Sequence, residues 1–192
     1  MPERPGGAQT RLRARVPAGN LWKTRVGIPK PEDRVELVDG EVVEMAPIGS
    51  RHHACVMRLD ELLRTHGTEE YLVSVQEPVR LSEINELQPD VALLKRREDF
   101  YSEAPPAPED VLLVVEVSDT TPAYDRNVKL PLYARSGIPE VWIVDVESQR
   151  VEIYSDPQSG SYNTVRRYGT RDTLHSATVP EISLRAGEIF GR

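Results

Sequence analysis

Alternating apolar and polar residues first become regular after position 34. Two short alternating runs, 35–38 and 41–45, lie on either side of the dipeptide Asp39-Gly40. Asp-Gly between such runs is typical of a two-residue type I′ turn, in which both central residues adopt positive φ. The pattern predicts an N-terminal β-hairpin.

Helical spacing of apolar residues occurs in two segments. Residues 54–65 repeat apolar positions every three or four residues, with Ser50 as the expected N-cap and Gly67 as the expected end. The residues expected to be buried by this helix are Cys55, Leu59, Leu62 and Leu63. Residues 124–135 have similar spacing, but Pro131 lacks an N–H group and is expected to kink that helix or displace its start.

Buried strands are expected in the middle of the chain. Residues 111–117 are apolar at nearly every position, which is typical of a strand covered on both faces, and residues 141–144 resemble them. Because a helix is predicted between them, these strands are expected to form a parallel crossover unit. Shorter strands are predicted at 71–76, 79–81 (continuing or bending the strand before it), 91–94, 151–154, 162–168 and 178–184, with a loop at 100–110. The elements predict a single α/β or α+β domain, in which helices flank a mixed sheet.

The overall composition is that of an ordinary globular protein. The chain has 192 residues, of which 39% are hydrophobic and 29% charged, so one domain with a real core is expected. No uncharged apolar run approaches the roughly 18–20 residues of a membrane span, so no membrane partner is predicted. Cys55 is the only cysteine, which excludes an internal disulfide and a cysteine-based zinc cluster. The simplest interpretation is a cytoplasmic protein.

Charge is distributed unevenly along the chain. Residues 1–30 contain seven basic residues and one acid, a net charge of +6, so the rest carries −13 of the total of −7. An acidic body repels polyanions, and a nucleic-acid partner would therefore need a local basic surface or bound cations. We predict a basic, partly flexible N-terminal segment at 1–30, followed by one domain at 31–192. The basic run 11–15 is either such a surface or part of a solvated tail.

The main candidate for chemistry is Glu116, because it follows five apolar residues in the strand expected to be most buried. A carboxylate there needs a metal ion, a cation or strong hydrogen-bond donors, unless it lies at the strand end and faces water. Asp90 precedes a neighbouring short strand, and Lys129 follows in the next helix, on one face with Asp125 and Tyr133. Two carboxylates on adjacent strands can hold Mg²⁺, and a nearby lysine can orient or deprotonate a water molecule.

Several segments resemble a known family. Pro89-Asp90, the acid Glu116 26 residues later and a following lysine resemble the arrangement of the PD-(D/E)xK nucleases. A larger set of segments, in the same order, resembles the Uma-type family of restriction endonuclease-like proteins. These segments are Glu36–Glu41, Pro47–His52, Gln88–Leu94, Val115–Thr120, Tyr124–Lys129 and Leu132–Asp145.

The resemblance carries expectations about fold and site. It implies a restriction endonuclease-like core of three α/β/α layers, with a divalent metal, Mg²⁺ or its substitute Mn²⁺, held by Asp90, Glu116 and the backbone carbonyl of Val117. The lysine of the usual motif stands two residues after the acid, whereas here Lys129 in the helix would take its place. The additional pocket residues that the resemblance implies are Glu36, Gln76 and Asp125.

Other residues have structural interpretations. His52 and His53 are adjacent, so on a helix they point about 100° apart and do not easily share a metal. A structural role is favoured for His52 over contact with substrate, and packing is favoured for Cys55, Tyr133 and Trp142.

The function predicted from the sequence is metal-dependent hydrolysis of DNA phosphodiester bonds. The alternative is a catalytically silent nucleic-acid-binding or assembly module on the same fold, because one fold can host several functions. The predicted partners are DNA and a second copy of the chain in a homodimer.

Overall fold

The protein is described here by a computed structural model, which covers residues 11–12, 34–66, 70–120 and 122–192. Apart from Arg11 and Leu12, the predicted basic segment 1–30 therefore lies outside the described residues, as does Gly67, the expected end of the first helix. None of the helices formed by the described residues is long and apolar enough to cross a membrane.

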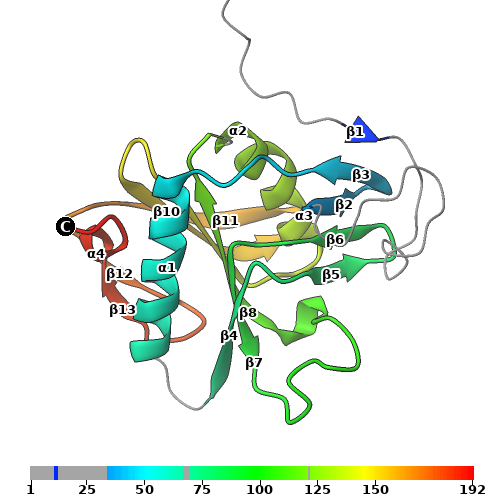
Figure 1. Cartoon of the computed structure of the whole chain (residues 1–192). Coiled ribbons are helices and arrows are strands. Elements are labelled where there is room, and N and C mark those ends of the chain that lie inside the picture. Colours follow the sequence, from blue (N-terminus) through cyan, green and yellow to red (C-terminus); the bar gives the residue numbers. More distant parts are fainter. Residues whose placement is uncertain (1–10, 13–33, 67–69, 121) are drawn as a thin grey trace, which may run out of the picture.

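A six-stranded mixed sheet forms the centre of the domain (Figure 1). Its strands, in spatial order, are β11 (Ser161–Gly169), β10 (Arg150–Gln158), β9 (Glu140–Asp145), β8 (Val111–Ser118), β7 (Val91–Lys95) and β4 (Tyr71–Val75). Strands β8 and β9 are parallel, and the other neighbours are antiparallel. The predicted parallel crossover is thus confirmed, and the strands predicted at 151–154 and 162–168 form the antiparallel pair β10–β11.

A second sheet contains the predicted hairpin. Its spatial order is β1 (Arg11–Leu12), β3 (Glu41–Glu44), β2 (Val35–Val38), β6 (Asn85–Leu87) and β5 (Val79–Ser82). Asp39 and Gly40 have φ of 48° and 79°, as a type I′ turn requires. The prediction that 79–81 continues or bends the preceding strand was wrong, because the chain leaves the first sheet after β4 and pairs β5 with the unpredicted β6.

The first long helix, α1 (Ser50–Thr65), begins earlier than its apolar repeat. Gly49 is its N-cap, without a side-chain hydrogen bond, so the assignment of Ser50 as the cap was wrong. Cys55, Leu59 and Leu63 are buried as predicted, whereas Leu62 is only partly buried.

The second helical segment is interrupted near Pro131, as predicted. It consists of α2 (Pro122–Tyr124), a π-helical turn η2 (Asp125–Lys129) and α3 (Leu130–Arg135). The N–H of Leu130 bonds to the carbonyl of Asp125, five residues earlier, immediately before the proline that has no N–H to donate. Asp125 and Lys129 are both buried on this turn, so the irregularity directs charged side chains into the protein.

The C-terminal region differs from its prediction. Residues 178–184 do not form one strand; instead β12 (Thr173–His175) pairs with β13 (Ser183–Arg185), followed by α4 (Ala186–Ile189). The turn between the two strands contains Pro180, which lacks the N–H that a strand ladder needs. The predicted loop at 100–110 is confirmed, apart from the short 3₁₀ helix η1 (Pro108–Asp110).

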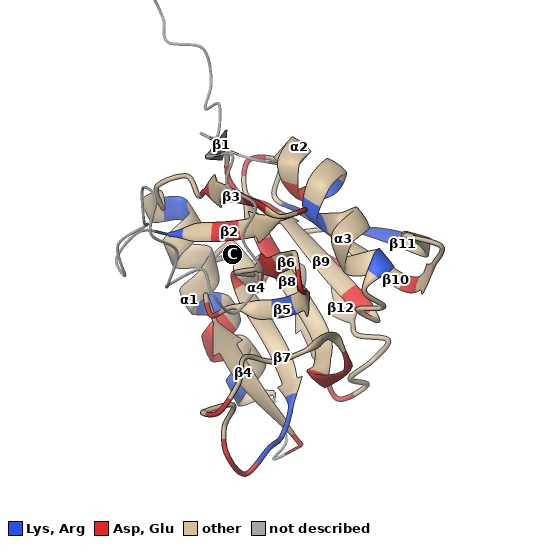
Figure 2. Ribbon diagram, turned by 90° about the vertical axis from the view of Figure 1, so that its right-hand side faces the viewer, with Lys and Arg blue, Asp and Glu red and all other residues tan. Residues whose placement is uncertain are grey.

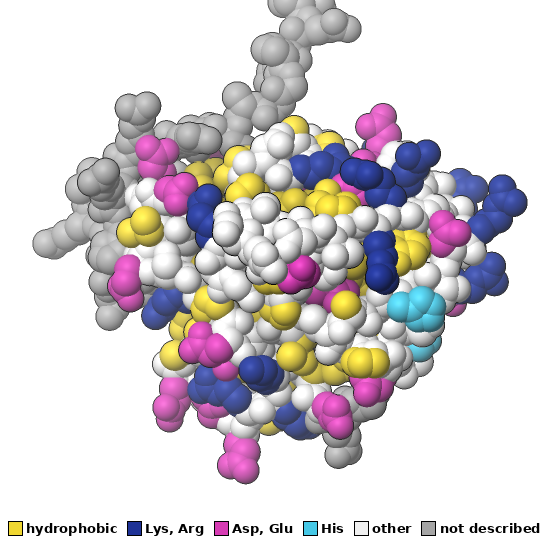
Figure 3. Space-filling model, turned by 180° about the vertical axis from the view of Figure 1, so that it is seen from behind, with side chains coloured by type: hydrophobic (Ala, Val, Ile, Leu, Met, Phe, Trp, Pro, Cys, Tyr) yellow, Lys and Arg dark blue, Asp and Glu magenta, His cyan; other side chains and the backbone are white. Residues whose placement is uncertain are grey.

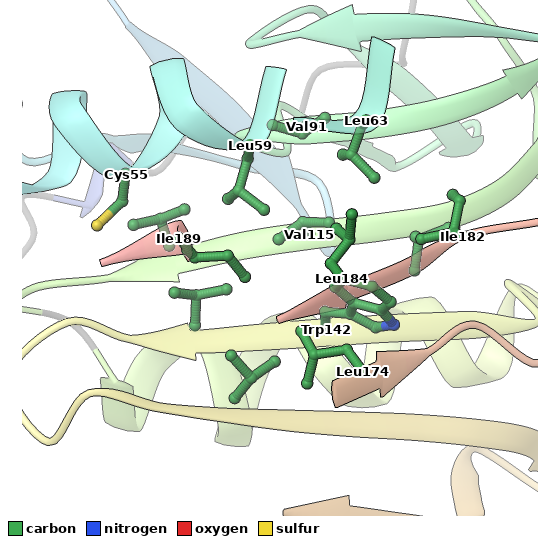
Figure 4. Packing of buried hydrophobic residues seen from close by; sticks show 14 of the residues in the cluster. Cys55, Leu59, Leu63, Val91, Val115, Trp142, Leu174, Ile182, Leu184 and Ile189 are labelled. Atoms are coloured by element: carbon green, nitrogen blue, oxygen red, sulfur yellow. The ribbon is translucent and has the colours of Figure 1, made fainter. Parts of the chain in front are cut away.

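Different layers cover the two faces of the central sheet. One face packs against α1, α4 and the β12–β13 hairpin; Figure 4 shows Leu59, Val115 and Trp142 within this core. The opposite face packs against α3 and the second sheet. The prediction of a mixed α/β domain with an N-terminal hairpin is confirmed. The predicted arrangement of three α/β/α layers differs on the second face, where the outer layer consists partly of helix α3 and partly of the second sheet.

A buried carboxylate connects the central sheet to the C-terminal region. Glu140, at the start of β9, is fully buried and accepts hydrogen bonds from Trp142 Nε1 at 2.6 Å and from the backbone N–H of Ala177 at 2.7 Å and Thr178 at 3.0 Å. The Ser176 hydroxyl donates to the same side chain at 3.1 Å. Glu140 therefore satisfies the buried side-chain donors of Trp142 and Ser176 and the part-buried N–H groups of Ala177 and Thr178.

We expect Glu140→Ala to lower the free energy of unfolding by about 3 kcal/mol, because the buried donors of Trp142 and Ser176 and two part-buried N–H groups would lose their acceptor at once. Urea denaturation measures the change. Glu147→Ala, at an exposed position close along the chain, is the matched control and should change stability by less than about 0.5 kcal/mol. Equal stability of the two variants would contradict this role for Glu140.

Candidate metal centre

Strand pairing brings the two carboxylates predicted to bind metal together. In the antiparallel pair β7–β8, Val91 lies opposite Val115 and Ala92 opposite Val114, so extending this register by one residue places Asp90 beside Glu116. The backbone N–H of Val117 donates to Asp90 Oδ2 at 2.9 Å. Both carboxylates are buried, with 5% and 3% of their surface exposed.

The ammonium group of Lys129 reaches this pair from the helical segment. Its Nζ lies 3.1 and 3.2 Å from the two carboxylate oxygens of Glu116, and 2.7 Å from Oε1 of Glu36. Glu36 belongs to β2, and its Oε1 also accepts the backbone N–H of Gln88 at 2.9 Å. Lys129 thus links the central sheet to the second sheet, and Figure 2 shows acidic positions on β2 and near β6 and β8 close to basic positions of the helical segment.

Two further residues of the predicted helical face point toward the same cluster. The hydroxyl of Tyr133, for which packing alone was predicted, donates to Glu116 Oε1 at 2.6 Å. The hydroxyl of Ser118 donates to Asp125 Oδ2. The only signal for Tyr133 in the sequence was its spacing of four residues from Lys129.

Asp90 is held by side chains from two other elements. His52 Nε2, from α1, lies 3.0 Å from Asp90 Oδ2, and Gln76 Nε2, from the residue after β4, lies 3.1 Å from Asp90 Oδ1. The structural role favoured for His52 did not include this contact. Its presence in a segment that resembles the Uma-type family was the signal that could have found it.

A cavity of about 140 Å³ lies over these groups. Its lining includes all the charged residues of the cluster, together with the loop between β3 and the start of α1. The lining residues that carry the chemistry are Glu36, His52, Asp90, Glu116, Asp125 and Lys129. The structure thus brings together five of the predicted site residues, with the sixth, Gln76, reaching the site through Asp90, and it adds His52.

Acidic side chains outnumber basic ones in this cluster. Four buried carboxyl groups, those of Glu36, Asp90, Glu116 and Asp125, surround the single ammonium of Lys129. Burial raises the pKa of Glu116 well above its usual value, even with Lys129 beside it. Burial alone would lower the pKa of Lys129, but the nearby carboxylates, first Glu116 and then Glu36, outweigh it and raise that pKa well above normal.

The other two carboxyl groups shift in opposite directions. Burial raises the pKa of Asp125. Burial acts in the same sense on Asp90, but the hydrogen bond from His52 and the nearby charges outweigh it, so its pKa lies below the usual value. Asp90 is therefore the readily ionised member of the pair that it forms with Glu116.

The donor set suits a hard divalent cation. Among the residues that the structure describes, no three His, Cys, Asp and Glu side chains are grouped so as to hold a metal ion by themselves. Mg²⁺, however, is commonly bound by one or two carboxylates and retains several water molecules. Asp90 and Glu116 supply such oxygens in a cavity lined by several carboxyl groups, so the residues fit Mg²⁺ with water completing its coordination.

On the face seen from behind, the described residues show no matching excess of positive charge. Figure 3 shows Lys and Arg side chains both at the upper right of this face and in its lower part, interspersed with Asp and Glu side chains. At the edge of the cavity, Arg51 is paired with Asp119 at 2.8 Å. A polyanion approaching the site therefore meets mixed charge.

Comparisons with known proteins identify the family. No curated protein matches the chain in sequence. Among solved structures, a "putative nuclease belonging to DUF820" from Anabaena variabilis is similar in fold, with a TM-score of 0.63 and 14% sequence identity over 84% of this chain and 92% of the other. The sequence profile of Uma2, described as "Putative restriction endonuclease", matches residues 24–187. Because that match spans most of the 192 residues, the chain belongs to the Uma2 family.

Proposed function

We propose that the protein is a Mg²⁺-dependent nuclease that hydrolyses phosphodiester bonds in DNA. In this proposal Asp90, Glu116 and the backbone carbonyl of Val117 bind the metal, for which Mn²⁺ can substitute, and Lys129 is the third catalytic residue. The observation that supports it most is the meeting of two buried carboxylates from adjacent strands and one ammonium group in a single cavity. The chain's membership of the Uma2 family favours this chemistry over other uses of the cluster.

The cluster needs a cation before it can accept a phosphate. Carboxyl groups outnumber the ammonium four to one, so a phosphodiester is repelled wherever more than one of them is ionised. A bound Mg²⁺ would supply the positive charge that stabilises the phosphate and the leaving oxygen, and would lower the pKa of a bound water molecule.

The residues of the chain then position the reacting groups. Lys129 lines the cavity and holds Glu116 by hydrogen bonds to both carboxylate oxygens. Because its three N–H groups already contact Glu116 and Glu36, in this proposal it donates to a water molecule or a phosphate oxygen by exchanging one of these contacts. Tyr133 fixes Glu116 from the other side, and Glu36 holds the ammonium in place. Residues 31–192 form the nuclease domain in this proposal, and the basic residues of 1–30 contribute positive charge toward DNA.

The alternative is a catalytically silent nucleic-acid-binding or assembly module. It is favoured by the contacts that Lys129 already makes with Glu36 and Glu116, because a buried ion-pair network can be a structural element. Homodimerisation is compatible with both functions and stays a prediction.

The test is incubation of the purified chain with a mixed panel of linear and supercoiled DNA in Mg²⁺, in Mn²⁺ and in EDTA. We expect cleavage in both metals and none in EDTA, because the acidic cavity requires a cation. Binding that weakens steeply with salt, without cleavage in either metal, would support the silent module instead. If the chain neither binds nor cleaves any DNA of the panel, both the nuclease and the nucleic-acid-binding module are contradicted.

A further inference from the structure

We infer that His52 is a positioning residue that, together with Gln76, leaves Asp90 with a single free acceptor position, on Oδ1, for a metal ion. This inference rests on the proposed function only in taking Asp90 as a metal ligand. It adds a role for a residue of α1, for which the sequence favoured a structural role, and it specifies which oxygen of Asp90 faces the cation.

The hydrogen bonds to Asp90 determine which of its oxygens is available. A carboxylate has about four acceptor positions, two on each oxygen. Oδ2 accepts from the Val117 N–H at 2.9 Å and from His52 Nε2 at 3.0 Å, so both of its positions are used. Among the described residues, Oδ1 accepts only from Gln76 Nε2, at 3.1 Å, which leaves one position free of their donors.

The three donors come from separate parts of the fold and prevent rotation of the carboxylate. Val117 lies in β8 and His52 on α1, whereas Gln76 follows β4. Gln76 adopts φ of 55°, which is unfavourable for a residue other than glycine, and its backbone N–H also bonds to the carbonyl of Asp90 at 3.1 Å. Such local strain is tolerated when the surrounding structure requires it and is frequent at functional sites.

A purely structural histidine does not account for the position of His52. Its side chain is 14% exposed, and among the described residues its Nδ1 is buried without a hydrogen-bond partner. Buried polar atoms are normally paired, so a histidine that only stabilised the fold would be expected to satisfy both ring nitrogens. Because Asp90 accepts and does not donate when ionised, Nε2 is the donor in this contact, and Nδ1 adds no hydrogen bond to the fold among the described residues.

The test measures metal affinity in the absence of DNA. Mn²⁺ binding is measured by isothermal titration calorimetry for the parent chain and for His52→Leu, His52→Gln and His53→Leu. We expect His52→Leu to raise the Kd about 10- to 100-fold, as loss of the partner of a metal ligand commonly does. His52→Gln places an amide N–H near the position of Nε2 and should restore the Kd to within about 3-fold. His53→Leu makes the matched change at the adjacent, exposed position and should leave the Kd unchanged.

A second variant keeps the test independent of the folding of His52→Leu. Gln76→Met removes the donor to Oδ1 at similar length, and we expect it to weaken Mn²⁺ binding as well; thermal melts in EDTA establish that each variant is folded. The inference is overturned if His52→Leu binds Mn²⁺ like the parent. If His52→Leu does not fold, the same result for Gln76→Met overturns it. Failure of His52→Gln to restore binding, or no Mn²⁺ binding by the parent at millimolar concentration, overturns it as well. Metal binding that behaves as expected, without DNA cleavage, would sustain this inference and contradict the nuclease function.

Discussion

Replacing Asp90 with asparagine should lower the rate of Mg²⁺-dependent DNA cleavage by about 10³-fold or more. The substitution keeps the size of the side chain but removes the charge and one acceptor oxygen from the carboxylate that lies beside Glu116. A metal ion supplies several kcal/mol of charge stabilisation to the transition state, and about 4 kcal/mol corresponds to a 10³-fold change in rate. Because the pKa of Asp90 is lowered and that of Glu116 is raised, Asp90 is ionised more readily than Glu116, so loss of Asp90 should weaken metal binding more than loss of Glu116.

Initial rates of plasmid nicking across a range of Mg²⁺ concentrations measure the effect. Asp156→Asn is the matched control: it makes the same chemical change at an exposed position with φ of 61°, a conformation that asparagine tolerates. Circular dichroism and the thermal midpoint establish that both variants are folded. Cleavage by Asp90→Asn at the rate of the control would show that the activity resides elsewhere.

Replacing Lys129 with methionine should lower the free energy of unfolding by about 3–5 kcal/mol at neutral pH. Methionine fills a similar volume, but the carboxyl groups of Glu36 and Glu116 lose the cation that contacts both of them. Removal of one partner from a buried ion pair has a cost of this size, because the other charge stays buried without compensation. Lys129 is therefore expected to stabilise the fold as well as to contribute to the site.

The loss should depend on pH. The pKa of Glu116 is raised in the folded protein. Between the ordinary glutamate pKa and this raised pKa, the folded state therefore retains a proton that an unfolded chain has released. The stability of a protein with such a group falls as pH rises from the ordinary glutamate pKa through the raised one. Without Lys129 the pKa should rise further, so Lys129→Met should be more destabilised at pH 8 than at pH 5.5.

Urea denaturation at both pH values measures these changes. Lys95→Met, at the exposed end of β7, is the control, and it should change stability by less than about 0.5 kcal/mol. Adding Glu116→Gln to Lys129→Met should recover part of the loss, because a neutral amide is less costly to bury than an unpaired carboxylate. A loss below about 1 kcal/mol in Lys129→Met, or no recovery in the double variant, would contradict the description of this ion pair.

The residues of the candidate site were predictable to different degrees. Glu116 stood out because a charged residue interrupts an apolar strand, and the positions of Asp90 and Lys129 followed from the resemblance to the Uma-type family. The contact of Glu36 with Lys129 crosses from one sheet to the other, and no local pattern indicates it. His52 and Tyr133 were assigned structural roles because the direction of a side chain depends on how its helix packs, which residue spacing alone does not specify.

Local sequence was sufficient for elements whose geometry depends on neighbouring residues. The Asp39-Gly40 turn and the apolar strands β8 and β9 follow from backbone preferences and from burial on both faces, which act over a few residues. Only the tertiary structure decided the remainder. The chain passes to a second sheet after β4, and 173–185 forms a hairpin. In the cluster around Lys129, acidic side chains outnumber basic ones. These features depend on contacts between segments far apart in the chain, whose free energies exceed the local preferences on which a sequence pattern is based.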